Sequence, residues 1–192
     1  MDQLRLETLA GCGLAIGGYP RFRYDASGGG GLGLVSAGAG PGRNGLRFAP
    51  EGLQIPALES RTTRFLGLPL PPGLTITIVP QQLEGELEPA TGQLKLRFQA
   101  CFRFAVGQLY RAPDLRIDTE LVTGEVTGQR HRASGQPRNA SGEVLLVGIA
   151  VVPPCGDPWL DRFLGLPDEA LALLRCRLLP ATPGPPPASP AP

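Results

Sequence analysis

Histidine and cysteine, which proteins often use as nucleophiles, general bases or metal ligands, are few here and lie far apart in the sequence. Among 192 residues there are one histidine and four cysteines, Cys12, Cys101, Cys155 and Cys176. No two cysteines form a Cys-x-x-Cys pair, the spacing by which a tight turn presents two thiolates to zinc or an iron–sulfur cluster. One histidine also excludes sites with several imidazole ligands, so we expect no metal and no other cofactor.

Nucleophilic catalysis would require Cys155 or a serine, with His131, the only histidine, as the general base. His131 lies between Arg130 and Arg132, and neighbouring positive charges disfavour the imidazolium that a general base becomes. We therefore assign no catalytic residue. A small enzyme of hydrolase or isomerase type that uses Cys155 or His131 stays open as an alternative function.

A glycine-rich segment, residues 28–33, matches the Gly-x-Gly-x-x-Gly pattern of dinucleotide-binding loops. Such a loop works only where a helix follows it, because the helix N-terminus faces the pyrophosphate. Residues 34–41 contain two glycines and a proline, which disfavour a helix. The pattern therefore predicts a flexible loop, and we infer no nucleotide cofactor from it.

A basic segment supplies three candidate polar contacts, Arg130, His131 and Arg132, which together with Arg138 predict a basic hairpin. Such a hairpin could hold single-stranded nucleic acid weakly through its phosphates. The chain has 18 basic and 17 acidic residues and a formal net charge of +1, so no long-range field attracts a polyanion. Nucleic acid is therefore not an expected partner, and weak binding of single strands is kept as a further alternative.

Apolar side chains provide the leading candidate for a site. Every second residue from 94 to 106 is apolar, which places three phenylalanines on one face of a strand. The sequence Arg-Phe-Leu-Gly-Leu-Pro occurs at 64–69 and again at 162–167. We interpret this repeat as coincidence or core packing, with a hydrophobic mouth formed by loops 65–72 and 159–167 as the functional alternative. The candidate ligand contacts are Phe65, Leu68, Phe98, Phe102, Phe104, Trp159 and Phe163.

An antiparallel sheet is needed to position these side chains. Residues 82–107 alternate in hydrophobicity on either side of a four-residue turn. A register that pairs Glu88 with Gln93 also brings Glu86 opposite Lys95, so charge and hydrophobicity match along the whole hairpin. The charged residues of this hairpin are therefore interpreted as a solvated face.

Two short helices are expected near the C-terminus. Asp157 and Pro158 supply an N-cap and a first-turn proline, and Gly165 supplies a stop. Residues 167–174 begin with Pro-Asp-Glu, a first turn that the helix dipole favours. The whole pattern indicates a mainly β fold, an antiparallel meander that forms a barrel or a sandwich, with one or two short C-terminal helices.

Glycine and proline divide the chain into three parts. We expect a glycine-rich, loosely ordered N-terminal region at residues 1–45, a single β-rich domain at 46–179 and a disordered proline-rich tail at 180–192. The first residues lack the apolar stretch of a signal peptide, and no apolar run reaches the roughly 20 residues of a spanning helix. We expect a cytoplasmic protein, and 17 arginines against one lysine indicate a GC-rich, bacterial genome.

The sequence as a whole predicts a non-enzymatic binding or scaffold protein. Its partner would be an apolar small molecule inside the sheet or the apolar surface of another protein, and peripheral membrane contact is compatible with the apolar loops. The sequence predicts no oligomeric state. A cavity on the order of several hundred Å³ inside the sheet would favour ligand binding, whereas a packed interior would favour contact through the surface.

Overall fold

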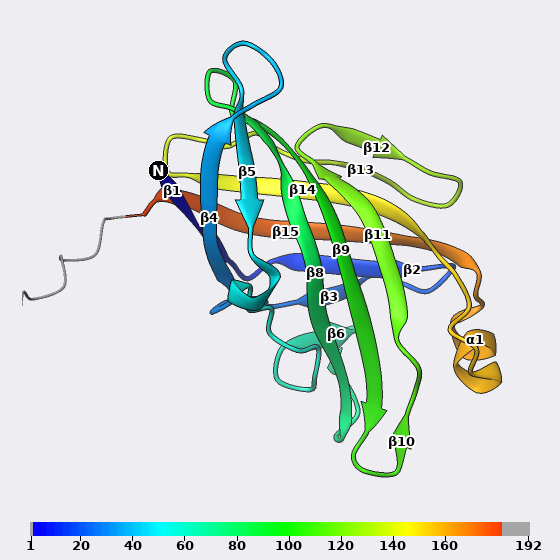
Figure 1. Cartoon of the computed structure of the whole chain (residues 1–192). Coiled ribbons are helices and arrows are strands. Elements are labelled where there is room, and N and C mark those ends of the chain that lie inside the picture. Colours follow the sequence, from blue (N-terminus) through cyan, green and yellow to red (C-terminus); the bar gives the residue numbers. More distant parts are fainter. Residues whose placement is uncertain (1, 182–192) are drawn as a thin grey trace, which may run out of the picture.

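The alternating residues form an antiparallel sheet that closes on itself (Figure 1). The computed structural model describes residues 2–181. Its strands are β1 (Gln3–Thr8), β2 (Cys12–Ile16), β3 (Phe22–Tyr24), β4 (Gly30–Ala37), β5 (Asn44–Phe48), β6 (Thr63–Phe65), β7 (Leu68–Pro69), β8 (Leu74–Glu88), β9 (Gln93–Val106), β10 (Tyr110–Arg111), β11 (Leu115–Val122), β12 (Glu125–Thr127), β13 (Arg132–Ser134), β14 (Glu143–Val152) and β15 (Asp168–Pro180). A short 3₁₀ helix, η1 (Pro50–Gly52), and an α-helix, α1 (Pro158–Leu164), accompany them. The predicted mainly β, antiparallel fold is confirmed.

Eight strands make a closed ring in the order β1, β4, β5, β8, β9, β11, β14 and β15, and β15 pairs with β1 to complete it. β11 and β14 are joined by a single rung between Val122 and Val147. β2 continues along β15 where β1 ends, since β1 pairs with residues 176–180 and β2 with residues 170–173. From β2 the sheet runs on through β3, β6 and β7, so additional strands surround the interior at that end.

The predicted hairpin consists of β8 and β9, and its register is the one expected from the sequence. Glu88 pairs with Gln93 and Glu86 with Lys95 in the sheet. Lys95 and Glu86 do not form an ion pair with each other, however, because each pairs with a residue on the other side of its own strand. Lys95 Nζ lies 3.1 Å from a carboxylate oxygen of Glu120 on β11, and Glu86 pairs with an arginine next to β5. These charges lie on the outer face, where an exposed ion pair contributes at most about 1 kcal/mol.

One of the two expected helices is present. The side chain of Asp157 caps α1 by accepting from the backbone N–H groups of Trp159 and Leu160, and Gly165 ends the helix with a φ of 69°. The second expected helix, residues 167–174, is wrong, because this segment begins β15. Within the described residues, no helix is both long and apolar enough to cross a membrane.

The start of β15 lacks the alternation of apolar and polar residues that predicts a strand, because both of its faces are apolar there. Its even-numbered residues point into the ring, and Leu171 and Leu173 point outward. Leu171 is nevertheless buried, and the turn between β12 and β13 lies over this outer face, bound to Glu169. A strand that is covered on both faces loses the period-two pattern that distinguishes it from a helix.

The N-terminal region differs from the loose order expected for residues 1–45. β1, β2, β3 and β4 belong to the same sheet as the strands that follow. Residues 30–33 of the glycine-rich segment are the start of β4, between β1 and β5, and not a flexible loop. At Gly30, whose φ is 134°, an added Cβ would lie 1.9 Å from the carbonyl oxygen of Leu6, so glycine alone permits this approach. The expected proline-rich tail lies outside the described residues from residue 182 onward.

The interior is tightly packed at one end of the ring. Side chains from β5, β9, β14 and β15 meet there with almost no exposed surface: Phe48, Leu96, Leu146, Cys176 and Leu178. Burial raises the pKa of the Cys176 thiol to about 12, as expected for a core cysteine. Toward the other end, the inward residues of the same strands, such as Phe102 and Ala172, keep part of their surface exposed. Space is therefore left inside the ring at that end.

Glu169 holds the β12–β13 turn onto the sheet. Its carboxylate is buried and accepts the backbone N–H groups of Gln129 at 2.7 Å, Arg130 at 3.1 Å and His131 at 2.8 Å. Burial acts to raise the pKa of this carboxyl, but the three donors outweigh it, and the pKa lies below its ordinary value.

Glu169→Gln is expected to lower the free energy of unfolding by about 1–3 kcal/mol near pH 7, because an amide cannot satisfy three backbone donors as a carboxylate does. A depressed pKa contributes stability that is present above the pKa of the unfolded state and is lost as the pH falls through the folded value. Urea unfolding at several pH values should therefore show the difference between wild type and variant disappearing in acid. Glu51→Gln, at an exposed position of η1, should change little.

Candidate functional site

A cavity of about 420 Å³ occupies the loosely filled end of the ring. β2, β3, β8, β9, β11, β14, β15 and α1 all contribute to its wall, which is almost entirely apolar. The lining includes Leu14, Phe22, Phe65, Ile76, Ile78, Phe98, Phe102, Phe104, Ile117, Leu164, Ala170, Ala172 and Leu174. The interior is therefore hollow where the extra strands widen it.

Small residues on one wall explain the empty volume. On the adjacent strands β14 and β15, Ala150 pairs with Ala170 and Gly148 with Ala172, and all four line the cavity. Protein interiors are otherwise close-packed, so a run of paired small residues leaves unfilled the volume that larger side chains would occupy. The three phenylalanines of β9 supply large side chains elsewhere in the wall.

The buried polar groups of the wall are already hydrogen-bonded within the protein. Thr119 Oγ1 donates to a backbone carbonyl of β14 at 2.8 Å, and Thr8 Oγ1 donates to the carbonyl of Ala26. Tyr24 donates its hydroxyl to the carbonyl of Pro56, and burial raises the pKa of this phenol. The wall therefore offers a ligand apolar contact and not free donors or acceptors.

Tyr19 and Phe163 are the two large apolar lining residues that are themselves exposed, so we place the opening of the cavity beside them. Tyr19 packs against Phe163 of α1, with ring centroids 5.9 Å apart, and donates its hydroxyl to the Phe163 carbonyl. Phe163 also stacks on Trp159 at 5.2 Å, and Trp159 meets Tyr110 of β10 edge-on at 5.6 Å. A row of aromatic rings therefore borders one side of the opening.

The turn between β6 and β7 borders the opening on the other side. Phe65 at the end of β6 stacks on Phe22 of β3, with ring centroids 4.6 Å apart, and both rings line the cavity. Figure 1 shows α1, β10 and the β6–β7 turn at the same end of the sheet. We call the segments that surround the opening, residues 17–21, 66–68, 106–110 and 158–163, the mouth rim.

The mouth rim exposes large apolar side chains. The exposed fractions are 95% for Leu109, 71% for Leu66, 69% for Leu68, 60% for Trp159 and 53% for Phe163. These residues come from three separate segments, the β6–β7 hairpin, the turn before β10 and α1, and none of them belongs to the buried core. Several large apolar side chains exposed at one end of a molecule are typical of an interaction site.

Five of the seven sequence-predicted ligand contacts line the cavity: Phe65, Phe98, Phe102, Phe104 and Phe163. Leu68 and Trp159 lie on the mouth rim. The two copies of the repeated sequence thus reach the same site from opposite sides, one through Phe65 and the other through Phe163. Ligand contact by these residues stays a prediction.

The predicted polar contacts lie elsewhere, on the turn that covers the outer face of β15. Arg130 Nε lies 2.7 Å from a carboxylate oxygen of Asp168, and Arg132 pairs with Glu125. Within the described part of the chain, His131 Nε2 is buried without a hydrogen-bond partner. Carboxylates therefore neutralise two of the cations expected to attract nucleic acid.

Cys155, the candidate nucleophile, lies beside the N-terminus of α1 and packs against its core side chains. Burial raises the pKa of its thiol, and the carboxylate of Asp161 raises it further. A thiol with a raised pKa is protonated near neutral pH, whereas a reactive cysteine needs the thiolate. The surroundings of Cys155 thus do not activate it.

Sequence reasoning missed the small residues that make the cavity. Ala170 and Ala172 lie within the wrongly expected helix, and no site was inferred from Gly148 or Ala150. The sequence pattern that could have identified them is the spacing of two residues between Gly148 and Ala150 and between Ala170 and Ala172. In two paired strands this spacing places all four small residues on one face of the sheet.

No protein-family model, curated protein or solved structure matches this chain.

Proposed function

We propose that the protein binds an apolar small molecule in the cavity and acts as a non-enzymatic binding or carrier protein. The observation that carries this proposal is a hollow of about 420 Å³ whose wall is apolar and whose buried polar groups are satisfied within the protein. Ligand sites are commonly cavities of about 300–1,000 Å³ with mostly apolar linings.

The volume restricts the size of the ligand. A cavity of about 150 Å³ lined by leucine, isoleucine and phenylalanine holds a benzene molecule. The cavity here, at about 420 Å³, has room for a ligand roughly three times as large, on the order of 18 carbon atoms. A single acyl or isoprenoid chain or a small fused-ring compound fits this range.

The hydrogen bonding of the wall restricts the polarity of the ligand. A polar group buried without a partner costs roughly 1–3 kcal/mol or more, and the interior supplies no free partner for one. An amphiphilic ligand would therefore place its apolar part in the cavity and its polar end at the opening beside Tyr19 and Phe163.

Titration with N-phenyl-1-naphthylamine, an uncharged probe that fluoresces in apolar surroundings, tests this proposal. We expect a saturable signal with one site per chain and a dissociation constant of micromolar order. Long-chain fatty alcohols should displace the probe, since they compete for the same apolar volume. Native mass spectrometry of protein taken directly from its host should show an added mass that organic solvent extracts.

A probe signal that rises linearly without saturation would contradict the proposal, as would a saturable signal that no hydrocarbon chain displaces. The first result means that probe molecules only adhere to the surface. The second places the probe outside the cavity.

A further inference from the structure

We propose that the mouth rim docks on a phospholipid bilayer that carries anionic headgroups, so that an apolar ligand passes between the bilayer and the cavity without entering water. This inference rests on the proposed function, because such a route matters only if the cavity holds a ligand. Three observations support it: the backbone of Leu66, the aromatic border of the opening, and a set of arginines that have no carboxylate partner among the described residues.

Leu66 is an exposed leucine in a conformation that leucine rarely adopts. Its φ is 51°, in the left-handed region, and its side chain is 71% exposed at the tip of the β6–β7 turn. Glycine or asparagine would suit this turn better, and the fold gains nothing from the exposed side chain. Backbone strain kept in order to present one side chain to solvent indicates a role outside folding.

The other exposed apolar side chains of the mouth rim surround the same opening. Leu68 follows Leu66 on its turn, Leu109 projects from the turn before β10, and Trp159 and Phe163 project from α1. Tryptophan is enriched at the interface between lipid headgroups and hydrocarbon. A bilayer that accepted these side chains would lie directly over the mouth of the cavity.

The charges around the opening favour an anionic surface. Four arginines on or next to the mouth rim form no ion pair with a carboxylate within residues 2–181: Arg21, Arg64, Arg111 and Arg162. The two carboxylates of α1 and its cap, Asp157 and Asp161, accept backbone N–H groups. The four arginines outnumber these two carboxylates, and each arginine near an anionic leaflet raises partitioning about fivefold.

A groove of about 550 Å³ on the outer face extends from Arg21 and Arg64 along β3. Gly11 and Gly13 line it and have no side chains to fill it. Arg23 and Arg64 lie directly opposite each other on β3 and β6, and a like-charge pair of this kind destabilises a sheet. A lipid phosphate between the two guanidinium groups would remove this repulsion.

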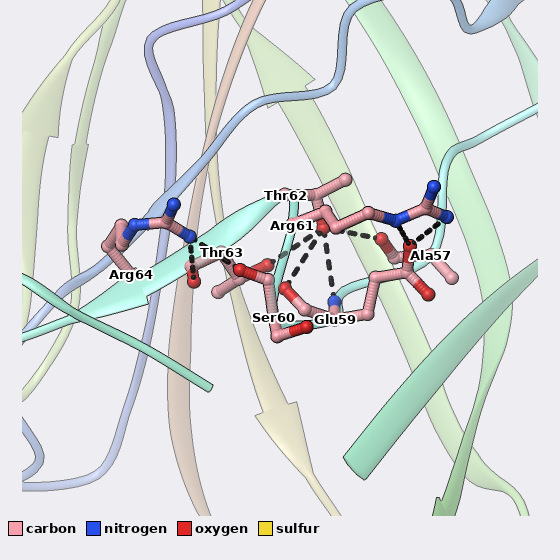
Figure 2. A network of polar contacts seen from close by, with 7 residues as sticks. All are labelled: Ala57, Glu59, Ser60, Arg61, Thr62, Thr63 and Arg64. Atoms are coloured by element: carbon pink, nitrogen blue, oxygen red, sulfur yellow. Dashed lines mark hydrogen bonds and ion pairs between the residues drawn. The ribbon is translucent and has the colours of Figure 1, made fainter. Parts of the chain in front are cut away.

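The position of Arg64 is fixed before any phosphate arrives. Figure 2 shows its Nη1 donating to the carbonyls of Ser60 at 2.6 Å and Thr63 at 3.1 Å. In the same turn Arg61 is occupied by the carboxylate of Glu59 at 2.5 Å. Arg64 therefore keeps its charge available beside Leu66, whereas Arg61 does not.

Trp159 is the only tryptophan and lies on the mouth rim, so its fluorescence reports docking directly. The experiment adds vesicles of phosphatidylcholine alone, or vesicles in which about a third of the lipid is phosphatidylglycerol, to the full chain. We expect a blue shift of the emission and co-flotation of the protein with the anionic vesicles, and weaker binding to phosphatidylcholine alone.

Leu66→Asn combined with Leu68→Asn should reduce partitioning at least about tenfold, because two leucines no longer enter hydrocarbon. Asparagine tolerates the left-handed turn, so this variant keeps the fold. The matched control is Leu32→Asn with Leu34→Asn, since these leucines are 48% and 45% exposed on β4, outside the mouth rim. The control should bind vesicles as the wild type does.

Arg23→Gln combined with Arg64→Gln should weaken binding to anionic vesicles about twentyfold and leave binding to phosphatidylcholine unchanged. Its melting temperature should change little, because the loss of the two hydrogen bonds that Arg64 donates is offset by the removal of a like-charge pair. A loss of equal size with both kinds of vesicle would overturn the role of the groove.

Docking is overturned if the wild type neither floats with anionic vesicles nor shifts its emission, or if the control loses as much binding as the Leu66 and Leu68 variant. A dimer in sedimentation that this variant turns into a monomer would show that a second copy occupies the rim, and would overturn it too. Probe titration without vesicles separates the two proposals. Probe binding without docking would overturn docking alone and leave ligand binding in the cavity supported. Docking without probe binding would overturn the proposal that the cavity binds a ligand.

Discussion

Ala172→Phe is expected to lower the affinity for N-phenyl-1-naphthylamine at least about 100-fold and to raise the melting temperature at the same time. Ala172 faces the cavity opposite Gly148, so the added ring enters empty space. Filling a cavity stabilises a protein by about 0.5–2 kcal/mol. The remaining volume would be too small for this three-ring probe. Probe titration and thermal unfolding measure the two effects on the same sample.

Ala105→Phe is the matched control, because it adds the same ring to the outward face of β9. This control should bind the probe as the wild type does. Unchanged affinity in Ala172→Phe would place the ligand outside the cavity. A fall in both affinity and stability would mean that the ring meets the wall, and Ala170→Phe then repeats the test at the neighbouring inward position.

The parts of the fold that were predictable from sequence depend on neighbouring residues. The β8–β9 register followed from matched pairs around one four-residue turn, and every rung from Glu88 to Glu84 agrees with it. α1 followed from its cap, its first-turn proline and its terminal glycine. In both cases the residues that determine the structure lie within about 20 positions of one another, where turn and cap chemistry acts directly.

The cavity depends on pairing across the closed sheet, which local patterns do not determine. Gly148 and Ala172 meet because β14 and β15 pair in one register, and Phe65 reaches the same space only because β6 joins through β3 and β2. The sequence identified most of the large side chains of the wall but not the small ones. The sequence left open whether the interior is hollow or filled, because volume depends on which residues face each other across the ring.

The glycine-rich start shows the opposite failure, a segment judged loose that is ordered. Composition alone cannot distinguish glycines that free a loop from glycines that let backbones approach. Gly31 and Gly33 are of the second kind, since a Cβ at Gly33 would lie 2.6 Å from the ring of Phe48. These close approaches let β4 pack between β1 and β5 and close the ring.

Gly30→Ala should therefore be among the most damaging single substitutions, lowering the free energy of unfolding by about 3–5 kcal/mol. The residue has a φ of 134°, and the new methyl group would lie 1.9 Å from the carbonyl oxygen of Leu6. β1 and β4 would have to separate there, which opens the ring next to its closure on β15. Since domains are stable by only about 5–15 kcal/mol, urea unfolding should show a large shift of the midpoint.

Gly28→Ala separates the two causes of this loss. Gly28 has a φ of 90°, but a Cβ there meets nothing within 4 Å, so only the backbone cost of about 1–2 kcal/mol applies. The difference between the two variants then measures the close approach of β4 to Leu6. Equal losses would mean that this approach is not tight in solution.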